Sequence, residues 1–326
     1  MSVEAYNIIF HGSATMPDDD STTQIGGAID KSTRVTFAPL DTTGTLKAVS
    51  SAAGDTTQSV TVYGRNAAGE KINETINLNG TTFAAGTESF ERIMKATKSA
   101  TTTGDVCVVE SSAEASGTAQ DGDTNEITLA AGASAVDNFY QFMIIITDDG
   151  DIREIVEYNG TTKVAKVRTW DNTPDSSTTY EIYNGVIFDK SPNEIDEVRR
   201  VFYDAAANPS GGAEKVLYEK VFVYNQHATL ALTNAVIDEV DEGAYATIEF
   251  ALETTLDGTG TNGSGNDRYV APSSGVGSFS SDAKNVVNSQ NFSPQSGQGV
   301  WLKLTLAAGS AAAKTYYKLQ TQGQST

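Results

Sequence analysis

The chain has 326 residues, of which 39% are hydrophobic, and it carries 42 acidic against 22 basic side chains for a net charge of −20. This excess of acid disfavours binding to nucleic acid or to anionic lipid, because both are polyanions. The single cysteine, Cys107, excludes an internal disulfide, so we expect apolar cores to stabilise the fold. The length predicts two or three domains, and neither a secretion signal nor a membrane-spanning apolar stretch is recognisable.

Residues 32–112 predict a first β-domain, because short alternating runs are separated by turn residues. Two of these runs, SVTVYGRN and KINETINL, are joined by NAAG, whose glycine tolerates positive φ. Alternation places Val60 and Val62 on one face, opposite the apolar side chains of Ile72, Ile76 and Leu78. The pattern predicts an antiparallel meander or Greek key that is buried on one face and solvated on the other.

A Ser-, Ala-, Glu- and Gly-rich passage at residues 111–126 predicts a linker or a long loop at the first domain boundary, and residues 113–188 predict a small β-barrel-like domain. The run QFMIIIT, residues 141–147, is apolar on both faces and predicts a central strand. Just before it, SAVDNFYQF favours one or two helical turns. The Asn-Gly pairs at 79–80 and 159–160 each predict a type I′ reversal of a β-hairpin, one in each domain.

Residues 189–326 predict an Ig-like β-sandwich domain, since they contain six strand-like runs, among them KVLYEKVFVYNQ and GVWLKLTLAAG. The cysteine pair of antibody domains is absent. Residues 256–298 form a long Gly-, Ser- and Asn-rich excursion between strands, and such loops are usually binding surfaces or disordered. The fold class predicted for the whole chain is all-β, with two or three antiparallel β-sandwich or β-barrel domains.

Side chains for nucleophilic catalysis are scarce, and we assign no catalytic residue. A site of this kind needs a histidine near a Ser or Cys, and only His11 and His227 occur. We interpret His227 as a turn or interface residue and Cys107 as a small buried side chain rather than a reactive thiol. Carboxylate pairs for glycoside hydrolysis stay open as an alternative, because their separation cannot be read from sequence. Trp170 and Trp301 lie in alternating runs and are expected in cores.

Two motifs match ligand sites only in part, and we assign no cofactor-binding or metal-binding residue. Gly258, Gly260 and Gly263 spell G-x-G-x-x-G, but no helix is predicted after them, so the pattern does not indicate a dinucleotide site. DGDTNE, residues 121–126, begins like a calcium loop but lacks the glycine and the final glutamate of an EF-hand. A looser calcium site there or at residues 18–20 is the alternative to a solvated acidic loop.

Residues 126–182 carry an ITLAAGAS…FY opening, an apolar strand, an arginine-bearing strand, the hairpin YNGTTKVA and a closing W…TPDSSTTYEI. This order resembles a module of virion structural proteins of tailed bacteriophages, except that TDDGDI replaces a more glycine-rich turn. The last third is similar to the same class through KVLYEKVFVYNQHATLALTNA and GVWLKLTLAAGS, and the first domain is similar to Ig-like head and tail modules more weakly. The resemblance covers roughly residues 55–322.

The resemblance implies a non-enzymatic building block of a phage particle, most simply a decoration or cement protein on the capsid exterior. It would bind the major capsid protein or other virion proteins across capsid subunits, and it would be made in the host cytoplasm and assemble as a homo-oligomer. Residues 1–31 would be an N-terminal arm held by partners. The alternative is a tail, neck or fibre protein that carries a module for binding host glycans. In that case the 256–298 loop would be the binding surface. A glycan depolymerase is disfavoured, because no fixed β-helix repeat appears.

Overall fold

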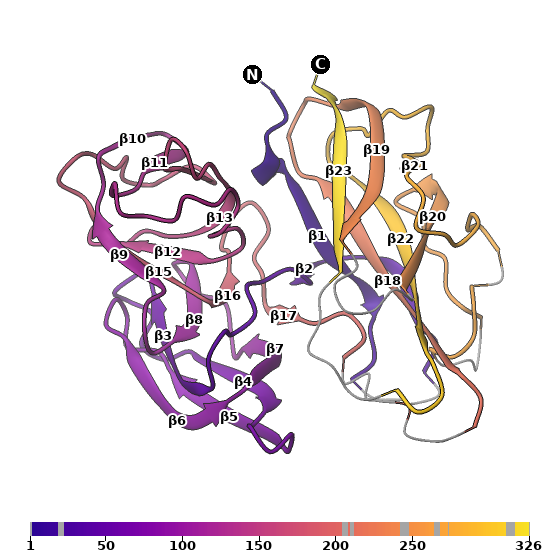
Figure 1. Cartoon of the computed structure of the whole chain (residues 1–326), viewed down its shortest axis with the longest axis horizontal. Helices are drawn as coiled ribbons and strands as arrows, with labels where there is room; N and C mark the ends of the chain where they lie inside the picture. The colour runs from indigo at the N-terminus through magenta and orange to yellow at the C-terminus, as the bar shows by residue number, and fades with distance from the viewer. Residues whose placement is uncertain are drawn as a thin grey trace. The chain divides into compact units, whose positions relative to one another are not determined.

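The computed structural model describes residues 2–18, 23–203, 208, 212–241, 248–263, 268–272, 274–310 and 317–325. Regular structure in these ranges is almost all antiparallel strand, with one short 3₁₀ helix, η1 (Ala5–Asn7), which confirms the predicted all-β class. No helix in the described ranges has the length and apolar character needed to cross a membrane. The chain forms two compact units, a terminal unit of residues 1–35 and 201–326 and a middle unit of residues 36–200 (Figure 1).

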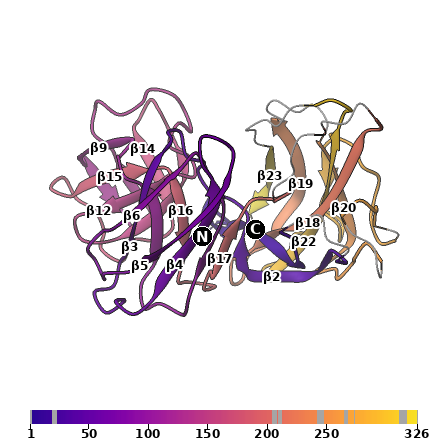
Figure 2. The same cartoon turned by 90° about the horizontal axis from the view of Figure 1, so that it is seen from below.

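The terminal unit is a sandwich of two antiparallel sheets. The first sheet has the strand order β20 (Ile248–Leu256), β22 (Ser296–Leu306), β18 (Lys215–Asn225), β1 (Ile8–Thr15) and β2 (Gly26–Arg34). The second has the order β21 (Lys284–Asn285), β19 (Leu232–Asp241) and β23 (Lys318–Ser325). Figure 2 shows the sheets as separate layers, with β19 and β23 in one and β18, β20 and β22 in the other. Buried apolar side chains that include Val221, Phe250 and Phe292 form the core of this unit.

The beginning of the chain is part of the terminal unit's fold, which corrects the predicted arm of residues 1–31. Residues 8–15 form β1, which pairs with β18 from Ile8 opposite Asn225 to Gly12 opposite Val221. Residues 189–326 are therefore not a self-contained domain, because their main sheet is completed by strands from the start of the chain. Local alternation cannot reveal this, since the paired residues lie more than 200 positions apart.

The middle unit contains a second sandwich. One sheet has the order β17 (Glu197–Arg199), β7 (Arg92–Lys98), β4 (Ser59–Arg65) and β5 (Lys71–Asn77). The facing sheet has the order β16 (Gly185–Phe188), β8 (Val106–Glu110), β3 (Gly44–Ser50) and β6 (Ala84–Phe90). The predicted register of the β4–β5 hairpin is confirmed, because Val60 lies opposite Ile76 and Val62 opposite Glu74, with both valines fully buried.

A small closed sheet completes the middle unit. Its strand order is β10 (Asp121–Asp123), β11 (Glu126–Thr128), β14 (Val164–Val167), β13 (Ile152–Tyr158), β12 (Ile144–Thr147), β15 (Thr179–Tyr183) and β9 (Ala115–Thr118). The two edge strands of this order, β9 and β10, follow each other directly in the chain. The two residues between them bond to opposite edges of the sheet. Ala119 N–H donates to Thr178 O, and Gln120 N–H donates to Thr128 O. The sheet thus closes as a barrel, and the predicted linker or long loop at 111–126 instead supplies the short strands β9 and β10 and the first residue of β11.

The predicted central strand is confirmed, because β12 lies between β13 and β15. The helical turns predicted for residues 134–142 are wrong, since that segment is an irregular loop. Neither Asn-Gly makes a type I′ turn, which needs positive φ at both residues. At 79–80 only Gly80 has positive φ, and the segment crosses from β5 in one sheet to β6 in the other. At 159–160 neither residue has positive φ. The loop closes instead through Lys163, which has φ +64° and donates its N–H to Asn159 O.

Candidate functional site

Strand β8 is buried on both faces, which places it between the sandwich and the barrel of the middle unit. Val106 and Val108 pack in the sandwich core, whereas Cys107 and Val109 pack with barrel residues such as Ile144. Alternate side chains of one strand therefore serve two cores, as the period of two along a strand requires. The junction between sandwich and barrel is a continuous apolar contact, and a polar network lies at its edge.

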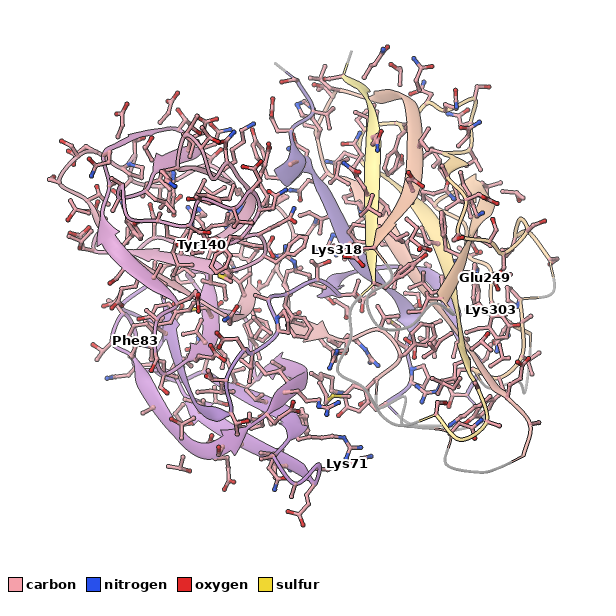
Figure 3. The ribbon with its side chains drawn as sticks, viewed as in Figure 1. Lys71, Phe83, Tyr140, Glu249, Lys303 and Lys318 are labelled. Atoms are coloured by element: carbon pink, nitrogen blue, oxygen red, sulfur yellow. The ribbon has the colours of Figure 1, made fainter. Side chains whose placement is uncertain are left out.

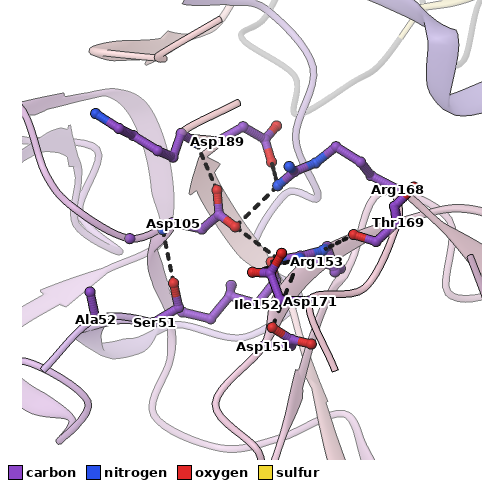
Figure 4. A network of polar contacts seen from close by, with 12 residues as sticks. Ser51, Ala52, Asp105, Asp151, Ile152, Arg153, Arg168, Thr169, Asp171 and Asp189 are labelled. Carbon is purple, nitrogen blue, oxygen red and sulfur yellow. Dashed lines mark hydrogen bonds and ion pairs between the residues drawn. The ribbon is translucent and has the colours of Figure 1, made fainter. Parts of the chain in front are cut away.

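The centre of this network is the carboxylate of Asp105, directly before β8 (Figure 4). It accepts hydrogen bonds from Arg153 Nη1 at 2.8 Å and Arg168 Nη2 at 3.1 Å, both from barrel residues. It also accepts one from the backbone N–H of Lys190 at 2.7 Å, just after the sandwich strand β16. Burial raises the pKa of Asp105, and the nearby Arg168 opposes that shift. One carboxylate thus joins the barrel to the sandwich.

The guanidinium of Arg153 has its partners within the middle unit. Its side chain is 1% exposed and donates to the carbonyl oxygens of Thr169 and Ile152, both at 2.9 Å. Nη2 lies 3.1 Å from the carboxylate of Asp171, and the group lies 5.9 Å from the ring centre of Trp170. A planar guanidinium presents its donors in a rigid fork, so these contacts fix its position. We interpret Arg153 as a cross-link of the fold.

The terminal unit contains a buried lysine held by carbonyl oxygens. Lys220 Nζ lies 2.8 Å from Glu253 Oε1, and the two side chains are 0% and 3% exposed. The same nitrogen donates to backbone oxygens of Gly27 at 2.7 Å, Gly258 at 2.9 Å and Gly260 at 3.2 Å. Burial lowers the pKa of Lys220, and Glu253 opposes the shift. The glycine motif therefore surrounds a lysine instead of a phosphate, and a Cβ at Gly258 or Gly260 would lie within 2.4 Å of a Glu253 oxygen.

A second buried pair anchors part of the long 256–298 segment. Arg268 Nη1 lies 3.3 Å from Glu219 Oε1, with both side chains 1% exposed, and it also donates to Tyr203 O at 3.0 Å. The other oxygen of Glu219 accepts from the N–H of Phe202 at 2.7 Å. The described parts of this segment therefore include a fixed buried contact. Most other described residues of the segment are partly or fully exposed, so a binding surface there stays a prediction.

The two histidines and the cysteine serve the fold. His11 is 1% exposed, its Nδ1 lies 3.2 Å from Thr33 O, and burial lowers its pKa to about 4. His227 Nδ1 accepts from the N–H of Leu230 at 2.9 Å, which confirms it as a turn residue. Cys107 is fully buried, as predicted, and burial raises the pKa of its thiol. These atoms are positioned to complete cores and turns.

The acidic segment at 121–126 forms the tight β10–β11 hairpin, where Asp123 Oδ1 accepts from Thr124 N–H at 2.6 Å. No group of three or more His, Cys, Asp and Glu placed to hold a metal ion occurs in the described ranges. Residues 19 and 20 of the other acidic stretch lie outside those ranges. Trp170 and Trp301 are 4% and 0% exposed, which confirms both as core residues.

The sequence contains one signal for the cross-links that pattern reasoning did not use. Arg153 and Lys220 each lie in a run predicted as a strand, REIVEY and YEKVFVY, where a charge must be paired if it is buried. Which acid pairs with each base depends on the tertiary structure. Comparison of the chain with protein-family models, with curated proteins and with solved structures finds no match.

Proposed function

We propose that this protein is a non-enzymatic structural component of a tailed-bacteriophage particle, namely a decoration or cement protein on the capsid exterior. It would bind the major capsid protein or other virion proteins across neighbouring subunits and assemble as a homo-oligomer. The observation that carries the proposal is the Asp105 network, which joins sandwich and barrel through charge-assisted hydrogen bonds. Such bonds are about twice as strong as neutral ones. A cement protein needs this resistance to separation of its parts.

The use of the other reactive groups supports the same proposal. Lys220, His227 and Cys107 are each engaged in packing or internal hydrogen bonds, as expected for a protein that acts through its surface. The net charge of −20 keeps a protein soluble at the high local density of a particle surface. The resemblance of residues 126–182 to virion modules is the basis for choosing a phage particle among possible assemblies.

The copy number of the protein in purified particles tests the proposal. Quantitative mass spectrometry against the major capsid protein should give a ratio within a few fold of the shell protein. A ratio of a few per cent would favour the alternative of a neck, tail or fibre protein, and glycan-array binding would then test the host-surface role. Absence from purified particles, with the protein present in infected cells, would overturn the virion proposal.

A further inference from the structure

A loop of the middle unit holds two apolar side chains out in solvent. The loop, residues 129–143, connects β11 to β12, and the side chains are Val136, 62% exposed, and Phe139, 42% exposed. We name these two residues the apolar tip. Two large apolar side chains exposed three residues apart in one loop can serve as a binding anchor if the loop is held in one conformation.

The base of the loop is tied to the end of β13 by the rings and backbone around Tyr158. Tyr158 O–H donates to Ser134 O at 2.6 Å, and Ser134 N–H donates to Tyr140 Oη at 3.0 Å. The Tyr158 hydroxyl is protonated at neutral pH, as an ordinary tyrosine is, and burial raises its pKa further, to about 12. The ring of Tyr140, labelled in Figure 3, packs edge-on between Tyr158 at 4.9 Å and Phe139 at 5.0 Å. The loop is therefore buried at its base and exposed at its tip.

Backbone contacts on both sides of the tip fix its shape. Asn138 N–H donates to Tyr158 O at 2.8 Å, and Asn138 has φ +56°, a conformation that costs free energy for a non-glycine residue. Asp137 Oδ1 accepts from Gly160 N–H at 2.7 Å, and Gly160 lies so near Ala135 that a Cβ would be 2.4 Å from its carbonyl group. An anchor ordered before binding loses less entropy on binding, which improves affinity.

The charge around the tip indicates the kind of partner. Residues 113–188 contain 13 acidic and four basic residues. Two of the basic residues, Arg153 and Arg168, are bound to Asp105. Lys163 Nζ donates to the carbonyl oxygens of Ser134 and Gly160, and Lys166 pairs with Glu157. Residues 113–188 therefore carry a net charge of −9 (13 acidic minus four basic side chains), and this negative charge opposes the approach of a second copy of the same domain.

We propose that the apolar tip is the docking anchor for a protein of the particle that presents an apolar pocket with a rim of lysine and arginine. The inference rests on the proposed virion function and adds the place and chemistry of the contact. Phe139 and Val136 fill the pocket, and the net negative charge of residues 113–188 attracts the basic rim. Aromatic side chains in desolvated pockets carry much of the binding energy of protein interfaces, so Phe139 dominates.

The test uses particles produced from the genome that encodes this chain with its gene deleted, incubated with the purified full-length protein. Binding is measured by co-sedimentation for the wild type, for Phe139→Ser and for the matched control Val240→Ser, which changes a valine that is 50% exposed in the terminal unit. Phe139→Ser should weaken binding at least tenfold, and Val240→Ser should stay within twofold. The wild type should bind less tightly as salt rises from 50 to 300 mM, because the rim contacts are screened.

The outcomes separate this inference from the function on which it rests. If Phe139→Ser binds particles as tightly as the wild-type protein and has the same melting temperature, the docking anchor is overturned and the virion role stands. No binding of the wild-type protein would overturn the virion role and the docking partner together. A homo-oligomer that dissociates in Phe139→Ser would show that a second copy occupies the tip, which contradicts the basic partner. Salt-independent binding that still requires Phe139 would overturn the basic rim.

Discussion

Replacing Asp105 with asparagine should loosen the junction between sandwich and barrel in the middle unit. The substitution keeps the size of the side chain but leaves the buried Arg153 without its closest carboxylate, at 2.8 Å. Removing one partner of a buried ion pair usually costs about 3–5 kcal/mol. Arg153 retains the carboxylate of Asp171 at 3.1 Å, and Arg168 retains that of Asp189 at 3.2 Å. The cost should therefore lie at the lower end of this energy range. We expect a loss of about 3 kcal/mol, which is roughly a hundredfold in the opening equilibrium.

Cys107 reports this opening, because it is the single cysteine of the chain, lies in the junction and is fully buried. Its labelling by a thiol reagent under native conditions should be roughly a hundredfold faster in Asp105→Asn, if labelling follows local opening. Each rate is divided by that of the same variant unfolded in urea, which removes the influence of Asp105 on thiol reactivity. Glu157→Gln, which breaks a more exposed pair with Lys166, should change the rate by less than about fivefold. Equal rates in the two variants would refute the network as a junction.

Three further substitutions test other parts of the structure. His11→Gln should remove a pH dependence of stability. Burial lowers the pKa of His11 from 6.5 to about 4, so the free energy of unfolding of the wild type should fall as pH drops from about 6.5 to 4. Urea titrations should show this fall as about 3 kcal/mol relative to the variant. Gly160→Ala should destabilise by about 1–3 kcal/mol in thermal unfolding because its Cβ meets Ala135, whereas Gly132→Ala, with open space at its Cβ, should stay within about 1 kcal/mol; similar values would contradict the close approach. Lys220→Met should cost about 3–5 kcal/mol in urea unfolding by leaving Glu253 buried without its cation, and adding Glu253→Gln should recover part of that loss; no recovery would argue against the pair.

The sequence by itself determined the class of the fold and the burial of particular side chains. Val60 and Val62 could be assigned to a buried face because strand side chains alternate with a period of two. Trp170, Trp301 and Cys107 could be assigned to cores because each lies in an alternating apolar run. These properties depend on neighbours within one strand or one hairpin, so local pattern is enough to predict them.

The tertiary structure decided which distant segments meet. It placed residues 8–15 beside β18, and it turned the predicted linker at 111–126 into strands that close a barrel. Both Asn-Gly turns depart from prediction for the same reason, because Gly80 serves a crossover between sheets and Gly160 a close approach to another loop. Strand pairing and charge pairing depend on atoms that are far apart in the chain. The partners of Asp105 and Lys220, and the exposure of Phe139 at the apolar tip, therefore became visible only when the chain was folded.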